Sequence, residues 1–393
     1  MNRRVLPSLS RFARWIVPAF CALVAAEAFA EPEEYRVSIH PSIRITSIAD
    51  DNVDLAEGGG GDVGTFFFPR IEMGVQGRYL HMGADLGVNV RRYLQDSSPN
   101  DVFLRFGGFG ELGILPGLTL RLSEAYSPTP VELGRPLDHS ANLVQTNRFA
   151  ASVRYWMEST QGSELSFVFQ ATRLTSEGFA ADVGAGIIND DFHADFWEGA
   201  FRTELHTPLT DTVSGFVRFQ ARVRNFDEAS AADLGDVSLM MGVSTQWWGI
   251  VDFDAAIGYG SIIFDEQKKN RFIGEANLRY RVSDGTTLRL AFDQRNTADI
   301  AGNDFTETTG RIDLERRYGE RTAASLALFL TRTNNESWKA GANLFGGVEA
   351  RVRRQMTRRT QLELRLRHWD NAGDFSADDF SQNQISLIFS YRR

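Results

Sequence analysis

The residues in this sequence that are best suited to bind a ligand are arginines. They occupy many of the alternate, polar positions in segments whose other positions are apolar. A guanidinium holds carboxylate or phosphate groups as a planar fork, and its charge does not titrate near neutral pH. Thirteen arginines follow this pattern: Arg105, Arg121, Arg154, Arg218, Arg222, Arg279, Arg281, Arg289, Arg311, Arg351, Arg353, Arg365 and Arg367. A wall that carries them would select anionic solutes or acidic sugars, so we expect these arginines to line a pore.

Carboxylates share the same side of these segments, and they offer a structural interpretation of the arginines. The set is Asp85, Glu111, Asp252, Asp254, Asp293, Asp313, Glu315, Glu349 and Glu363. An arginine opposite a carboxylate on the next strand forms an ion pair that satisfies both charges and stiffens the wall. The sequence leaves both roles open for the arginines.

The sequence offers no comparable case for catalysis. Its six histidines are scattered, and it contains neither a strand-to-helix nucleophile turn nor a phosphate loop. The one cysteine, Cys21, lies within the first thirty residues. Acidic residues gather in polar connections, such as Asp50, Asp51 and Asp54, but follow no twelve-residue calcium pattern. We therefore expect no enzyme activity, no cofactor and no metal site.

The elements that position the arginines have a period of two, which is the period of a β-strand. In residues 362–367 leucines alternate with Glu363, Arg365 and Arg367, and the same alternation recurs along the chain. We count roughly 18 such segments, most about 10 to 14 residues long, and a tilted strand needs about 9 to 11 residues to cross a bilayer. The segments are therefore long enough to span a membrane.

The connections between these segments alternate between long and short. Long polar connections are predicted near 49–63, 96–101, 127–143, 177–190, 227–235, 265–270, 298–305, 334–339 and 370–381. Short turns are predicted near 81–83, 114–117, 159–163, 207–212, 248–250, 283–286, 319–320 and 357–360. This layout is typical of an all-β, closed, antiparallel, up-and-down transmembrane β-barrel with short periplasmic turns and long extracellular loops. We expect 18 strands, while Pro41 and Pro69 keep 16 strands open as an interpretation.

Composition and charge exclude several other classes of protein. The 393 residues are 42% apolar, which is too many for a disordered chain, and the net charge of −9 does not favour nucleic acid as a partner. Residues 1–30 combine basic residues, an apolar stretch and small residues at a cleavage site, so we expect a secretion signal there. Residues 31–393 would then form a single barrel domain. A soluble β-helix or propeller is not expected, because the sequence has no repeat of fixed length. A pair of β-sandwiches is not expected either, because the sequence has no compositional boundary near its middle.

The predicted connection 127–143 is the best candidate for a loop that folds inward and narrows the pore. Prolines within it would stiffen the backbone. Glu132, Arg135, Asp138 and His139 could then present polar groups to the cargo.

Several segments resemble an outer-membrane β-barrel porin family associated with exopolysaccharide export, of the alginate-export kind. They are 50–53 (Asp-Asp-Asn-Val) after the first strand, 66–69 (Phe-Phe-Phe-Pro), Tyr93 at a strand end, and 147–155 at the start of another strand. The resemblance implies a porin-like exit for a polymer or small solutes, with no catalytic residues to carry over. One departure is that two arginines follow Tyr391, whereas outer-membrane barrels commonly end on an aromatic residue.

We therefore predict a porin in the outer membrane of a Gram-negative bacterium, reached by Sec export, that passes an acidic exopolysaccharide or anionic and sugar solutes. The expected partners are outer-membrane lipid and lipopolysaccharide, the barrel-insertion machinery and periplasmic polysaccharide-export components. A plugged barrel with a structural or surface-binding role is the alternative. An outer-membrane barrel hydrolase is a further alternative.

Overall fold

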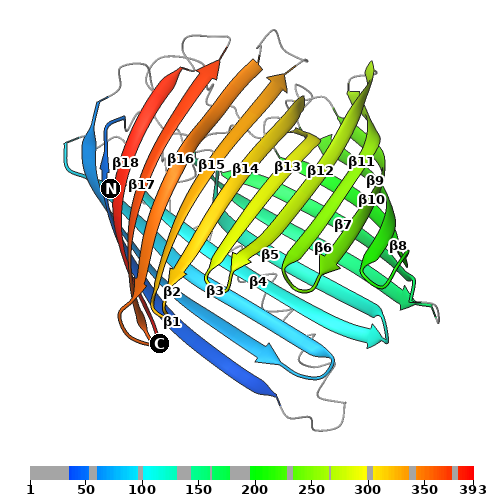
Figure 1. Ribbon diagram of the computed structural model, residues 1–393, viewed down its shortest axis with the longest axis horizontal. Coiled ribbons are helices and arrows are strands. Elements are labelled where there is room, and N and C mark those ends of the chain that lie inside the picture. Colours follow the sequence, from blue (N-terminus) through cyan, green and yellow to red (C-terminus); the bar gives the residue numbers. More distant parts are fainter. Residues whose placement is uncertain are drawn as a thin grey trace.

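The computed structural model describes residues 35–52, 60–95, 101–130, 143–159, 162–177, 195–227, 233–264, 267–298, 304–335, 342–373 and 379–393. In these ranges the chain forms one sheet (Figure 1). Its strands are β1 (Arg36–Asp50), β2 (Asp62–Gln76), β3 (Leu80–Tyr93), β4 (Asp101–Leu115), β5 (Leu118–Pro130), β6 (Leu143–Glu158), β7 (Glu164–Glu177), β8 (Phe196–Pro208), β9 (Val213–Phe226), β10 (Leu234–Trp247), β11 (Val251–Phe264), β12 (Gln267–Ser283), β13 (Thr286–Ala298), β14 (Asp304–Tyr318), β15 (Thr322–Asn335), β16 (Ala342–Gln355), β17 (Thr360–Gly373) and β18 (Phe380–Arg392).

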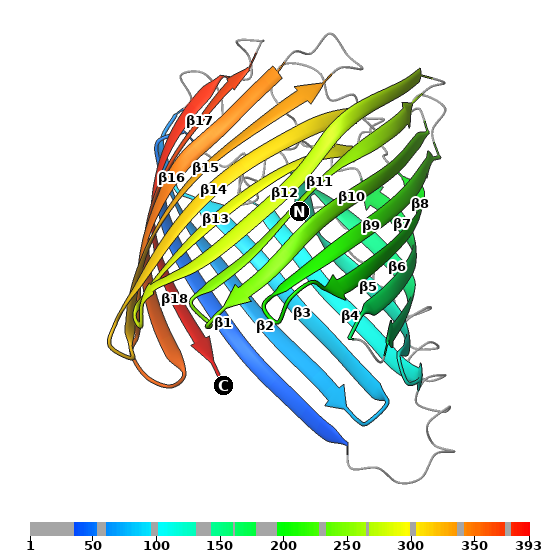
Figure 2. The same cartoon turned by 45° about the vertical axis from the view of Figure 1, so that its right-hand side comes forward.

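The sheet closes on itself, because each strand pairs antiparallel with the next and β1 pairs antiparallel with β18. The closing ladder runs from Ser42 opposite Arg392 to Asp50 opposite Gln384. Figures 1 and 2 show the strongly tilted strands wrapped into a barrel. The prediction of a closed, antiparallel, up-and-down barrel with 18 strands is confirmed. We find no helix in the described ranges that has the length and hydropathy to cross a bilayer.

The two prolines that left 16 strands open do not interrupt the barrel. Pro41 lies in β1 opposite Ile71, just beyond the point where the ladder with β18 starts. Pro69 lies in β2 at a gap in the ladder with β3, between the pairs made by Phe67 and Arg70. Because proline lacks a backbone N–H, it is tolerated where no ladder bond is made from its nitrogen. The interpretation with 16 strands is therefore wrong.

Long connections and short turns alternate as predicted, but several predicted bounds are wrong; the connection predicted at 370–381, for example, begins later, because β17 extends to Gly373. The first turn is at residues 77–79, and residues 81–83 lie inside β3, so Gly83 is a strand residue rather than a turn residue. The connection predicted at 265–270 is shorter, because Lys268 and Lys269 belong to β12. Pro130 ends β5, so the connection predicted at 127–143 begins later. In each case, residues that the sequence placed in a connection are held in the ladder by the neighbouring strands.

The barrel wall has one apolar face and one charged face. Alternate residues such as Leu362, Leu364 and Leu366 on β17 are exposed on the outside, while the residues between them face inward. Lipid solvates an apolar exterior of this kind, and closure removes the unpaired strand edges that lipid cannot satisfy. A closed barrel of this size with an apolar exterior and a polar interior is typical of proteins of the Gram-negative outer membrane.

The turn that joins β10 to β11 has an unusual backbone. Its central residues are Trp248, with φ of 48°, and Gly249, with φ of 65°, and the N–H of Ile250 donates to the carbonyl of Trp247 at 2.8 Å. Positive φ at both central residues is the two-residue hairpin geometry that matches the twist of β-strands. Trp248 is 91% exposed, so its side chain is not held by packing within the chain.

Candidate functional site

The strand registers place all thirteen predicted arginines on the inner face of the wall. On β16 and β17, for example, Arg351 lies opposite Arg365, and Arg353 lies opposite Glu363. On β9, Arg218 lies opposite Glu204 of β8. The arginines therefore share the interior with the carboxylates, and the ion pairs between them decide which guanidinium groups could meet a solute.

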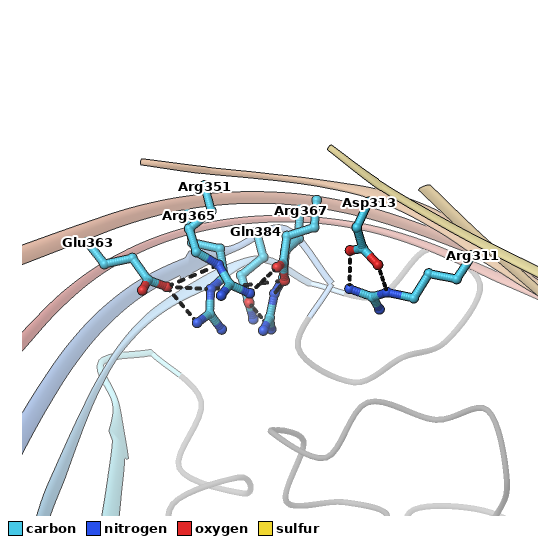
Figure 3. Close-up of polar contacts among 8 residues, drawn as sticks. Arg311, Asp313, Arg351, Glu363, Arg365, Arg367 and Gln384 are labelled. Carbon is cyan, nitrogen blue, oxygen red and sulfur yellow. Dashed lines mark hydrogen bonds and ion pairs between the residues drawn. The ribbon is translucent and has the colours of Figure 1, made fainter. Parts of the chain in front are cut away.

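One dense cluster of ion pairs lies on β16, β17 and β18 (Figure 3). Glu349 accepts hydrogen bonds from Arg351 and from Arg367, the latter at 2.7 Å. Glu363 accepts from Arg365 at 2.6 Å and lies 3.5 Å from Arg351. The side chains of Glu349 and Glu363 are only 15% and 8% exposed, so these carboxylates are held by arginine rather than by water. This cluster serves mainly to build the wall.

A second cluster lies on the opposite part of the wall, on β8, β9 and β12. Glu204 accepts hydrogen bonds from Arg202 at 2.5 Å, from His206 at 2.5 Å and from Arg218. Arg218 also donates to Glu275 at 2.7 Å. One carboxylate thus gathers two arginines and a histidine, and Arg218 links it to a second carboxylate across three strands.

Four predicted arginines are paired loosely and remain half-exposed. Within the described residues, each makes one carboxylate contact, of 3.5 to 3.9 Å, and has a side chain that is 47 to 55% exposed. These arginines are Arg105, Arg121, Arg279 and Arg289. Ion pairs of this length and exposure are weak, so these guanidinium groups can turn toward a passing anion.

Three further predicted arginines, Arg154, Arg281 and Arg353, make no ion pair within the described part of the chain. Arg154 lines a cavity of about 790 Å³ together with Trp156, a residue that is 42% exposed. A free guanidinium beside an exposed indole can hold a carboxylate and stack on a ring at the same time.

Several arginines on the inner face were missed by the sequence analysis, among them Arg202 of the second cluster, and two of these missed arginines lack a carboxylate partner among the described residues. Arg44 on β1 lines a second cavity of about 690 Å³, and Arg148 on β6 lies opposite Ala125. Neither makes an ion pair with another described residue. The flanking isoleucines, Ile43 and Ile45, carry the alternation that could have revealed Arg44, whereas Arg148 follows Asn147 on the outer face and so breaks the pattern.

The remaining predicted residues are placed as follows. Arg222 contacts Asp236 at 3.2 Å, and Arg311 forms a two-pronged contact with Asp313 at 2.7 Å (Figure 3). The predicted constriction residues all lie outside the described residues: Glu132, Arg135, Asp138 and His139. The predicted secretion signal, residues 1–30, also lies outside them.

One ion pair lies at the end of the wall that carries the long connections. Arg173 on β7 donates to Asp227, just after β9, at 2.7 Å. Its guanidinium also lies 5.2 Å from the ring of Trp197. The hydrogen bond from Arg173 lowers the pKa of the Asp227 carboxyl. The pair links the ends of β7 and β9 across the intervening β8, beside the connections.

Comparison with solved structures supports the fold. The chain is similar to OccK9 (OpdG) of Pseudomonas aeruginosa, with 14% identity, 91% of this chain and 98% of that chain covered, and a TM-score of 0.53. It has the fold of an outer-membrane barrel. The structure of OpdK of Pseudomonas aeruginosa with vanillate matches with 13% identity, the same coverage and a TM-score of 0.51. OccAB4 of Acinetobacter baumannii matches with 10% identity, again over 91% and 98% of the two chains, with a TM-score of 0.51.

A scan against protein-family models finds no match, and a search of curated proteins finds no relative. The similarity is therefore one of architecture, at identities of 10 to 14%. It is consistent with a barrel of the outer membrane, and OpdK is itself described as an outer membrane protein. It does not extend to the alginate-export family that the sequence segments resemble.

Proposed function

We propose that this barrel is an outer-membrane porin that passes small anionic solutes, and that its arginines select them. The observation that carries the proposal is the set of inward arginines that are weakly paired or unpaired in the described part of the wall. Fixed positive charges in a water-filled pore raise the local concentration of anions and lower that of cations.

The solute class follows from what surrounds the free guanidinium groups. Arg154, Trp156 and Ser166 line one cavity, which offers a charge-assisted fork, an aromatic face and a hydroxyl. Carboxylates with a ring or a sugar attached match this combination. The OpdK structure, which shares the architecture, contains vanillate, an aromatic carboxylate, and this supports the choice of class.

The second candidate cargo is an acidic polysaccharide. It is favoured by Trp156, which lines the first cavity and is 42% exposed. A sugar ring could stack on this indole while Arg154 holds a carboxylate of the same polymer. The sequence resemblance to exopolysaccharide-export porins points the same way.

The test is reconstitution of the purified barrel in planar bilayers under a potassium chloride gradient. We expect stepwise conductance with a reversal potential that indicates anion preference, and block by vanillate at lower concentration than by alginate oligomers. Cation preference would overturn the anion proposal. Absence of steps would favour a plugged barrel, and release of fatty acid from the bilayer lipid would favour a hydrolase.

Variants link the selectivity to the wall. R154Q/R281Q/R353Q removes three charges that have no carboxylate partner in the described residues, and we expect it to shift the reversal potential toward zero. The matched control R321Q/R358Q/R359Q removes three charges from short turns outside the wall. If both variants shift selectivity equally, net charge rather than the wall arginines sets it.

A further inference from the structure

The end of the barrel that carries the short turns holds a compact group of exposed arginines on one side. We call this group the arginine arc, and it comprises Arg321, Arg354, Arg358, Arg359, Arg392 and Arg393. It lies on the β14–β15 turn, on and beside the β16–β17 turn, and at the end of β18.

Backbone hydrogen bonds show that the arc is continuous in space. The N–H of Gln355 donates to the carbonyl of Arg321 at 2.7 Å, and the N–H of Arg392 donates to the carbonyl of Arg359 at 2.9 Å. The N–H of Arg393 then donates to the carbonyl of Pro41 on β1 at 3.1 Å. The arc therefore runs from the β14–β15 turn to the edge of β1.

The arc has few carboxylates to neutralise it. Glu320 is the one carboxylate in the turns at 319–321 and 356–359, both of which are fully described. Within the described residues, Arg392 makes the arc's one ion pair, with Glu72 at 3.1 Å. The guanidinium groups of the other arginines in the arc are therefore accessible to an anionic partner.

The arc ends beside an unpaired strand edge. Residues 36–40 of β1 pair with β2, but β18 stops at Arg392, opposite Ser42. Among the described residues, no strand pairs with the other edge of this segment. Lipid cannot satisfy such an edge, so the segment lies in water or against another polypeptide. Val37 and Ile39 on it are 69% and 62% exposed.

We propose that this end of the barrel docks an acidic, extended segment of a periplasmic partner protein. The segment adds as a strand to the free edge of β1, and its carboxylates meet the arginine arc. The strand edge decides the class of partner, because backbone N–H and C=O groups can be matched by a peptide but not by phospholipid or polysaccharide. The arc lies to one side, so a docked partner leaves the mouth of the barrel open.

The edge offers a precise way to block docking. Because the carbonyl of Pro41 accepts from Arg393, the polar groups of Pro41 face the β18 side, and those of Ile39, two residues away, face it as well. I39P therefore removes a donor from the free edge while the bonds to β2 remain. The native Pro41 shows that β1 tolerates proline in this orientation.

The test uses the full barrel in detergent micelles and a labelled ten-residue peptide of alternating glutamate and valine. We expect binding that weakens with salt, and a loss of roughly tenfold in affinity for R358Q/R359Q/R393Q. I39P should cause a similar loss. The control R44Q/R148Q/R154Q, which removes three charges from the inner face, should bind the peptide as the unmodified barrel does.

Three results would overturn the proposal. One is that the peptide binds the arc variant R358Q/R359Q/R393Q and the I39P variant as tightly as it binds the unmodified barrel. Another is a loss in the inner-face control as large as that in the arc variant, since the peptide would then be entering the lumen. The third is tighter binding of alginate oligomers or phosphatidylglycerol vesicles than of the peptide, with the same dependence on the arc. Folding of each variant is checked by heat-modified mobility on gels.

Discussion

Replacement of Glu349 by glutamine tests whether the ion pairs of the inner wall stabilise the barrel. Glu349 holds Arg367 at 2.7 Å and also contacts Arg351, and its side chain is 15% exposed. A hydrogen bond to a charged group contributes about 1.5 to 3 kcal/mol, so two of them contribute about 3 to 6 kcal/mol. Water in the lumen screens the charges and glutamine keeps one acceptor, so we expect E349Q to lower the free energy of unfolding by about 2 to 3 kcal/mol.

The assay is equilibrium unfolding in guanidinium chloride of the barrel folded in micelles. Glu111 provides the matched control, because its contact with Arg121 is 3.5 Å long and the two side chains are 35% and 47% exposed. We expect E111Q to lower the free energy of unfolding by less than about 0.5 kcal/mol. In the double variant E349Q/R367Q, removal of the surplus positive charge should restore about half of the loss. Equal costs for E349Q and E111Q would refute the reasoning.

Three further results are expected. G347A should destabilise the barrel by more than about 1 kcal/mol in the same unfolding assay, because a Cβ there would lie 2.3 Å from a backbone oxygen of the next strand. W248N should keep the hairpin and raise stability by about 0.5 kcal/mol in micelles, since asparagine adopts positive φ more easily than tryptophan. Arg173 lowers the pKa of Asp227, so their ion pair stabilises the fold above the ordinary carboxyl pKa and is lost as pH falls through the lowered value. D227N should therefore remove part of the acid sensitivity of hydrogen exchange at the ends of β7 and β9, and an unchanged acid profile would contradict this.

Much of the fold was predictable, because apolar and polar residues alternate along each strand and this alternation shows which side chains face lipid and which face the interior. Leu362, Leu364 and Leu366 face lipid for the same reason that Arg365 and Arg367 face inward. The number of strands followed from the number of long connections and short turns. That number does not change when the bounds of one connection are wrong by a few residues. The errors fell at single residues such as Gly83, where the pairing of neighbouring strands outweighs the preference of one side chain.

The inner face was harder to predict than the fold. The sequence indicates which side of a strand an arginine occupies, but its partner depends on register, which shifts with turn length. Arg218 and Arg281 look alike in sequence, yet Arg218 binds two carboxylates and Arg281 has no ion pair among the described residues. The distinction between wall-building and free arginines therefore required the structure.

The incomplete seam between the first and last strands has a consequence for biogenesis. The β1–β18 ladder joins nine residue pairs, whereas the β1–β2 ladder joins fifteen. Since β1 is synthesised first and β18 last, β1 waits with an open side throughout translation and transit. A chain truncated before residue 380 would lack its closing strand, so it would remain an open ribbon exposed to proteases instead of becoming a narrower channel.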